Sequence, residues 1–229
     1  MIGLSNDIVV YDSGSTDGTL DILRRFDLRL HEGPWKGFGK TRQLAVDLAQ
    51  HDWVFILDAD EVVSEELATE LKTADRSSGN VAYSVLQENY LGEKHIRFGT
   101  WGHDVRVRLY HREFLRWREV LVHETLIIPE QITVVRFNNT IRHFTARNSA
   151  ELLDKMQQYA ELTARQYHAR GKRPAWFKRS FGGFFAFVKG YLIKLGFLDG
   201  RKGYQIASIQ ARYTALKYRK LQELWQAHS

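Results

Sequence analysis

Cysteine is absent from the 229 residues of this chain, which excludes disulfide bonds and metal sites built from thiolates. Its absence is consistent with a reducing compartment. Also missing are internal repeats, low-complexity tracts and, in the opening MIGLSNDIVVYD, the basic start and long apolar core of a signal peptide. A composition of 44% hydrophobic and 26% charged residues is typical of a globular protein and not of a disordered one.

Acidic residues are scarce in the last quarter of the chain. From Gly171 onward, twelve lysines and arginines face only Asp199 and Glu223, which gives a charge of +10. Because the whole chain carries +6, the remainder is at −4. A basic end on a near-neutral body indicates a polyanionic partner, which could be a membrane, a nucleic acid or an acidic substrate.

Strand and helix signals alternate over the first part of the chain. The β-branched run DIVVYD (7–12) is followed by a turn, by helical spacing over 20–26 and by the strand-like LRLHE (28–32). A helical pattern over 40–50 then precedes WVFILD (53–58), which is continuously apolar, as in a strand buried on both faces. This alternation predicts an α/β fold with a mostly parallel sheet flanked by helices.

The pattern changes twice beyond these elements. From Val81 to Phe144, shorter strands alternate with aromatic-rich loops, at VAYSVLQENY, VRVRLYH, VLVHETL, TVVRF and TIRHF. A long helical pattern then begins at Ser149, which the sequence favours as the N-cap. We therefore expect a domain over 1–147 and a basic helical extension over 148–229.

Two acidic turns follow strands of the predicted sheet. Ligands of a parallel sheet bind beyond the carboxyl ends of its strands, so we expect Asp12 and Asp58 at one edge. Asp58 and Asp60 point the same way in an extended segment, and their oxygens suit Mg²⁺ or Mn²⁺, with substrate phosphates completing the shell. Two alternatives stay open: DSGSTDG could be only a capped turn, and the later acids, Glu61 above all, could cap the next helix.

A phosphate-loop resemblance lies between these two turns. GPWKGFGKT (33–41) would match G-x-x-x-x-G-K-[ST] only with glycine at the position of Pro34, which has no N–H to donate. A nucleotide triphosphatase is therefore disfavoured. Lys40 and Arg42 remain candidates for contacting a diphosphate, against the alternative that they are merely solvated at a helix start.

Several motifs in consistent order together resemble one known family. These are IVVYDSGSTDGT, WVFILDADE, GTWGHDVRVRLYHR, RWREVLVHE and GFLDGRKGY. They resemble family 2 glycosyltransferases with the GT-A fold, and within them the bacterial branch that adds glucose in a β-1,4 linkage to the inner core of lipopolysaccharide or lipooligosaccharide. The turn DSGSTDGT is common to many such enzymes, whereas VHE and GFLDGR point to this branch.

The resemblance implies roles for the donor site and for catalysis. Asp12 matches the acid that accepts from the uracil ring of the donor. Asp58 and Asp60 match the D-x-D motif, with Asp60 the firmer metal ligand. Glu124 in VHE matches the general base, with His123 as its alternative.

Three further residues have weaker counterparts in the family. His143 lies where such enzymes often place another metal or diphosphate contact, although a lone histidine beside a strand is often only structural. Trp101 and Asp104 would line the sugar and acceptor pocket, although Trp101 could equally belong to the core.

The resemblance also implies a reaction and a place in the cell. We expect an inverting transfer of glucose from UDP-glucose to a heptose of the lipopolysaccharide core, by a cytoplasmic enzyme peripheral to the bacterial inner membrane. Family members have another strand and helix before DIVVYD, so we expect a missing wall beside the uridine and a bare sheet edge. The alternative is a truncated non-catalytic remnant, or a basic adaptor on a membrane or a nucleic acid.

The apolar stretch 181–198 belongs to the basic end of the chain. Lys189 and Lys194 interrupt it, whereas spanning segments need about twenty mostly uncharged residues. The flanking basic and aromatic residues favour an interfacial helix on anionic lipid, with a helix packed on the catalytic domain as the alternative. No recognised motif supports nucleic-acid binding.

Overall fold

A computed structural model describes residues 3–122 and 124–227 of the chain. The chain forms two compact units and passes between them several times, whereas the sequence predicted one boundary at residue 147. That boundary falls inside the second unit, two residues before a helix begins. The first unit comprises Met1–Ala59, Val63–Leu86 and Val105–Thr140, and the second comprises Asp60–Val62, Gln87–Asp104 and Ile141–Ser229.

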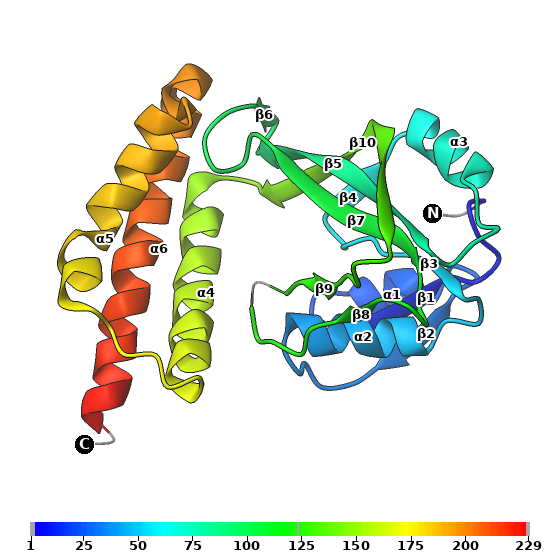
Figure 1. The fold of residues 1–229 in the computed structure, drawn as a ribbon, viewed down its shortest axis with the longest axis horizontal. Coiled ribbons are helices and arrows are strands. Elements are labelled where there is room, and N and C mark those ends of the chain that lie inside the picture. The colour runs from blue at the N-terminus through cyan, green and yellow to red at the C-terminus, as the bar shows by residue number, and fades with distance from the viewer. Residues whose placement is uncertain (1–2, 123, 228–229) are drawn as a thin grey trace. The chain divides into compact units, whose positions relative to one another are not determined.

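The first unit begins with the predicted strand–helix–strand alternation (Figure 1). Its elements are β1 (Val9–Asp12), α1 (Thr19–Leu23), β2 (Arg29–Glu32) and α2 (Phe38–Asp47). β1 and β2 pair in parallel, from Val9 opposite Arg29 to Asp12 opposite Glu32. The expected parallel arrangement is therefore confirmed for this pair of strands.

The expectation that DIVVYD and WVFILD share one sheet is wrong. β1 and β2 form a two-stranded sheet, whereas β3 (Trp53–Phe55) belongs to a six-stranded sheet and pairs antiparallel with β7 (Asp104–His111). A continuously apolar run reports that both faces are buried, but it does not specify the direction or identity of the paired strand. The inferred shared ligand edge for Asp12 and Asp58 therefore has no support from strand pairing.

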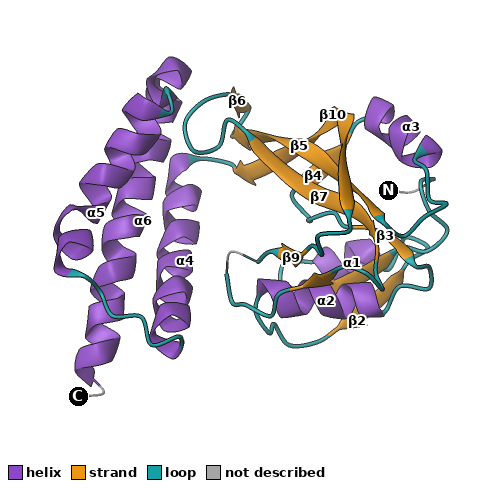
Figure 2. Ribbon diagram, in the orientation of Figure 1, coloured by secondary structure: helices purple, strands orange, loops and turns teal. Residues whose placement is uncertain are grey.

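The larger sheet has the order β3-β7-β5-β10-β4, with β6 paired to β5 (Figure 2). Two of its strands, β5 and β10, are long. β10 contains both TVVRF and TIRHF, which the sequence predicted as separate strands. The expected strand VLVHETL is reduced to β9, which pairs with β8. The remaining bounds are β4 (Glu61–Val63), β5 (Val81–Leu91), β6 (Lys94–Ile96), β8 (Arg116–Trp117), β9 (Leu126–Ile127) and β10 (Thr133–Ala146).

The helix α3 (Glu65–Thr73) is capped by the Ser64 hydroxyl and not by Glu61, for which a capping role had stayed open. The Ser64 side chain accepts from the N–H of Leu67 at 3.2 Å, as an N-cap does. Glu61 lies three residues earlier in β4, is 6% exposed and accepts a hydrogen bond from the amide of Gln87. Glu61 therefore is a buried strand residue and does not cap the helix.

The part of the second unit from Ser149 to Ala227 is mainly helical, in agreement with the helical extension predicted over 148–229. It contains α4 (Ser149–Ala169), α5 (Trp176–Val188), the π-turn η1 (Lys189–Ile193), the 3₁₀-turn η2 (Gly196–Asp199) and α6 (Gly200–Ala227), and α6 packs against both α4 and α5 (Figures 1 and 2). The cap of α4 is Asn148 and not Ser149, because the Asn148 side chain accepts from two backbone N–H groups at 3.0 Å.

Among the described residues, no single helix is long and apolar enough to span a membrane. Trp176–Ile193 and Gly196–Ala227, bent by 73° at the break between them, meet the length and composition required of a span only when taken together.

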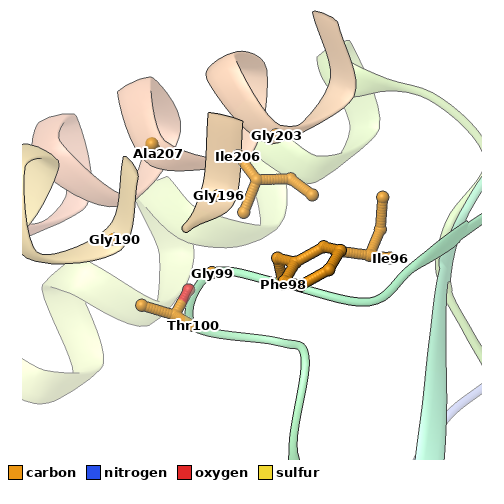
Figure 3. A pocket seen from close by; sticks show the side chains of 9 residues that line it. All are labelled: Ile96, Phe98, Gly99, Thr100, Gly190, Gly196, Gly203, Ile206 and Ala207. Carbon is orange, nitrogen blue, oxygen red and sulfur yellow. The ribbon is translucent and has the colours of Figure 1, made fainter. Parts of the chain in front are cut away.

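Close backbone packing explains the motif GFLDGRKGY in the second unit. The Asp199 carboxylate accepts from the N–H groups of Arg97 and Phe98 at 2.8–3.2 Å, which ties the loop after β6 to the turn before α6. Near these hydrogen bonds, Gly196 and Gly203 line a cavity of about 10 Å³ (Figure 3). This volume is near the lower limit for one water molecule. The small residues are therefore required by contact between backbones.

We predict that Gly203→Ala destabilises the protein by about 2 kcal/mol, as overpacking a tight contact does. A Cβ at this position would lie 1.8 Å from the carbonyl oxygen of Gly196, which is backbone and cannot move alone. Gly182→Ala is the matched control, because its Cβ would meet the nearest atom at 3.4 Å. Urea unfolding of both variants measures the difference, and an equal stability of the two variants would contradict this packing argument.

Candidate functional site

Arg42 joins two of the predicted site residues within the first unit. From helix α2 its Nη2 donates to both carboxylate oxygens of Asp58 at 2.6 Å, and its Nη1 donates to the Glu124 carboxylate. Asp58 follows β3, whereas Glu124 lies between β8 and β9. The fold thus brings together a predicted donor ligand, the predicted general base and a predicted diphosphate contact.

A second guanidinium completes the charge balance at Asp58. Arg108 from β7 places its Nη2 3.3 Å from Asp58 Oδ2. Burial raises the pKa of Asp58 while Arg108 and Arg42 lower it, and the net pKa shift is downward. Asp58 is therefore a carboxylate held by two cations from two different elements, which is the compensation that an acid at a buried strand end requires.

Trp117 supports the guanidinium of Arg42 from one side. The Arg42 Cζ lies 5.1 Å from the centre of the Trp117 ring, a cation–π distance. The Trp117 backbone N–H donates to Gln43 at 2.9 Å, and its indole N–H donates to the hydroxyl of Tyr110 at 2.8 Å. Arg42 is thus fixed by packing as well as by charge.

Arg108 and Trp117 belong to this cluster but were not predicted from the sequence. The alternation in VRVRLYH offered a signal, because Arg108 and Tyr110 lie two residues apart and hence on one face of the strand. Arg108 is only 3% exposed, and a buried arginine on a strand requires an acidic partner. Trp117 carried no comparable signal, since its contact with α2 depends on tertiary packing.

Asp60 and His143 meet within the second unit, as a shared metal site would require. His143 Nε2 lies 3.5 Å from Asp60 Oδ1, and Lys155 Nζ lies 4.0 Å from Asp60 Oδ2. The other ring nitrogen of His143 is 2.7 Å from Asn89 Oδ1, while Asn89 Nδ2 donates to the carbonyl of Trp101 at 2.9 Å. Because the Asn89 oxygen can only accept, the proton lies on His143 Nδ1.

This hydrogen-bonding pattern suits a histidine that binds a metal through Nε2. However, no group of three His, Asp or Glu side chains among the described residues is arranged to hold a metal ion. Asp60 and His143 therefore fit two ligands of a divalent cation, and other oxygen atoms would have to complete its shell. Asp58 is engaged by Arg42 and Arg108, so its role as a metal ligand stays a prediction.

Asp12 uses its carboxylate inside its own turn. One oxygen accepts from the N–H groups of Gly14 and Ser15 at 2.9 Å, and the other accepts from the Ser15 hydroxyl. The Ser15 hydroxyl and N–H groups lower the pKa of Asp12 and keep it ionised. The arrangement is the capped turn that the sequence left open, and a contact with uracil stays a prediction.

The remaining predicted residues contribute less to the described geometry. Trp101 packs beside a core cluster that contains Leu91 and Ile206, which agrees with the alternative that it is a core residue. Asp104 is half-buried at the start of β7. His123 lies outside the described residues.

Comparison with known proteins gives a family and several relatives. The family model described as "Glycosyl transferase family 2" matches residues 3–137. Lipopolysaccharide core biosynthesis glycosyltransferase LpsC of Rhizobium meliloti is 30% identical over 228 residues, which cover 94% of this chain and 82% of LpsC. Uncharacterized glycosyltransferase RP128 of Rickettsia prowazekii is 24% identical over 232 residues, which cover 96% of this chain and 79% of RP128.

A solved structure with a similar chain course is S. aureus TarS 1–349 in complex with UDP-GlcNAc. The match covers 97% of this chain and 83% of the TarS chain, with 14% identity and a TM-score of 0.46. Because this TM-score is below 0.5, the assignment of a family rests on the sequence matches.

We predict that Asp58→Asn lowers the free energy of unfolding by about 3 kcal/mol at pH 7, because it leaves two largely buried guanidiniums short of a charge. The folded-state pKa of Asp58 is depressed, so the stabilisation is present above the unfolded value of about 3.9 and is lost as the pH falls through the folded value. The cost of the substitution should therefore shrink below about pH 4.

Urea unfolding at pH 7 and at about pH 3 measures this difference. Asp21→Asn is the matched control, because the Asp21 side chain is 76% exposed in its pair with Arg24 and should change stability little. A cost for Asp58→Asn that is the same at both pH values would contradict an electrostatic role.

Proposed function

Because the chain belongs to glycosyl transferase family 2, we propose that it transfers glucose from UDP-glucose to a heptose of the lipopolysaccharide inner core. That it is a glycosyltransferase follows from its family. The donor sugar and the acceptor are the proposed part, and the observation that supports them is the 30% identity to LpsC, a lipopolysaccharide core biosynthesis glycosyltransferase, over 94% of this chain.

The proposed reaction is a single displacement at the anomeric carbon. The acceptor hydroxyl gives its proton to the Glu124 carboxylate while its oxygen forms a bond to the anomeric carbon. The bond from that carbon to the diphosphate breaks, and UDP leaves with the electron pair. One displacement inverts the carbon, so an α-linked donor gives a β-glycoside.

Arg42 is a positioning residue for this base. It holds Glu124 and Asp58 at once, and Trp117 limits the movement of the guanidinium. An oriented carboxylate needs less reorganisation when the acceptor arrives. The position of Glu124 thus depends on contacts with α2 as well as on its own loop.

A divalent cation is proposed for the donor side, at Asp60 and His143. When bound, it would offset the negative charge of the UDP leaving group. Asn89 fixes the His143 ring so that Nε2 faces Asp60, and this orientation is the chain's own contribution to such a site.

We also place the protein on the cytoplasmic face of the bacterial inner membrane, at the anionic lipid surface. The last 59 residues carry a charge of +10, and α5 exposes large aromatic side chains beside its lysines and arginines. Aromatic rings enter the headgroup zone while basic residues attract anionic lipid.

We expect Glu124→Gln to reduce kcat with UDP-glucose and a heptose-containing core acceptor by about 10²–10⁴-fold, as loss of a general base does. UDP binding measured by calorimetry should be unchanged, because the base acts on the acceptor. Glu119→Gln is the matched control, since Glu119 is an exposed carboxylate paired with Lys40.

Three outcomes would contradict parts of this assignment. A loss of turnover with His123→Gln and not with Glu124→Gln would move the base to His123. Turnover only with another UDP-sugar would refute glucose as the donor. No turnover of the wild-type chain with any donor would favour a non-catalytic role.

A second prediction concerns the cation. UDP binding should strengthen on addition of Mn²⁺, and Asp60→Asn should remove this effect because it takes away a charged oxygen ligand. Asp154→Asn provides a control carboxylate on α4. Calorimetry with and without chelator measures both, and metal-independent UDP binding that Asp60→Asn leaves unchanged would refute the proposed cation site.

A further inference from the structure

The helix α5 and the turns after it carry large apolar side chains that the protein leaves exposed. Trp176 is 69% exposed, Phe184 64% and Ile193 71%. Eight other large apolar side chains between residues 177 and 204 are exposed to at least 43%. Large apolar side chains left exposed in one segment often mark an interaction site. This segment therefore exposes many large apolar side chains to solvent.

A groove runs between α5 and α6 within this surface. It has a volume of about 300 Å³, at the lower end of the range for small-molecule sites. Its walls are mainly apolar and include Phe177, Phe185 and Ala186 of α5 and Tyr218 of α6. Apolar and aromatic side chains make up most of this lining, so the groove suits an apolar chain better than a charged group.

Two lysines line the groove. Lys178 and Lys189 line it and are eleven residues apart, about 16 Å along a helix. Lys178 lies in the first turn of α5, a thirteen-residue helix whose first turn contains no acid. The positive end of the helix dipole thus adds to the charge of this lysine.

A third lysine, Lys217, lies among aromatic rings and is close enough to Lys178 to be repelled by it. Its Nζ lies 4.7 Å from the ring centre of Tyr213, 5.1 Å from that of Tyr218 and 5.9 Å from that of Tyr167. The Tyr167 ring also has the Nζ of Lys172 at 4.4 Å. Burial, Lys172 and Lys178 lower the pKa of Lys217 to about 8.

These groups place lysine side chains next to the apolar groove. The cations that act on Lys217 are other lysines, so a bound anion would relieve repulsion that the protein otherwise carries. Tyr218 contacts Lys217 and lines the groove, so the charged cluster and the groove are contiguous. A ligand that matches both has an anionic head and an aliphatic chain.

We propose that the groove between α5 and α6 binds one anionic phospholipid, with its phosphate at Lys178 and Lys217 and an acyl chain along Phe185 and Ala186. This inference rests on the membrane association proposed above. It goes beyond that association, because nonspecific adsorption needs only surface charge and exposed aromatic rings, whereas this site holds one lipid in a fixed position.

The test is binding of monomeric dihexanoyl phosphatidylglycerol to the full chain, followed by calorimetry or NMR below the micelle concentration. Lys217→Met should weaken binding about tenfold, as loss of a charge-assisted contact does. Ala186→Phe should weaken it by a similar factor by filling the groove. Lys220→Met, on the same helix and paired with Glu223, and Ser180→Leu, at an exposed position of α5 outside the groove, are the matched controls.

Dihexanoyl phosphatidylcholine and inorganic phosphate separate the sources of affinity. The zwitterionic lipid should bind more weakly than phosphatidylglycerol because it has no net negative charge. Free phosphate should also bind more weakly, because it has no acyl chain. Phosphate that binds as tightly as the lipid would reduce the site to a free-anion site. Phosphatidylglycerol binding unchanged by both Lys217→Met and Ala186→Phe, or tighter binding of duplex DNA at physiological salt, would overturn the proposal.

Vesicle sedimentation keeps the two proposals apart. The wild-type chain should sediment with phosphatidylglycerol vesicles and less so as salt rises, and Lys217→Met should still sediment because most basic residues remain. Sedimentation without short-chain lipid binding would leave membrane association intact and refute the specific site. Short-chain binding without sedimentation would refute the membrane association alone.

Discussion

The organisation of the first unit depends on how Arg42 is neutralised. Its guanidinium is shared between Asp58 and Glu124, and Arg108 adds a second cation to Asp58. A carboxylate at the end of a buried strand is costly without such partners. The ion pairs therefore hold α2, the turn after β3, β7 and the loop that carries Glu124 together, and the Trp117 ring packs against the Arg42 guanidinium.

The second unit depends instead on close contacts between backbone segments. Asp199 ties the loop after β6 by accepting from two N–H groups, and glycines at 196 and 203 remove the side chains that would separate the segments. This packing sets the loop that carries Trp101 against the helices. The same helices leave large aromatic side chains of α5 exposed, and the proposed lipid contact rests on this exposure.

The sequence anticipated chemistry better than geometry. Arg42, Asp58 and Glu124 were each singled out, yet as a diphosphate contact, a metal ligand and a base, and not as partners in one ion-paired cluster. Asp60 and His143 were expected to cooperate and do lie together. The predicted capping roles of Glu61 and Ser149 were wrong. Glu61 is a strand residue hydrogen-bonded to Gln87, and Asn148 supplies the cap of α4. A local residue pattern does not resolve a tertiary contact of this kind or a shift of one position.

By itself the sequence determined the α/β class, the helical C-terminal region, the family and the uneven charge, because periodicity, motif order and composition are local properties of the chain. Only the tertiary structure decided that β1 and β3 lie in different sheets, and that Arg108 and Trp117 complete the cluster around Arg42. It also decided that Lys217 lies among three tyrosines beside an apolar groove. Ion pairs join residues up to 95 positions apart, as Asp60 and Lys155 are. These ion pairs and the strand partners depend on long-range packing, which no local pattern of residues encodes.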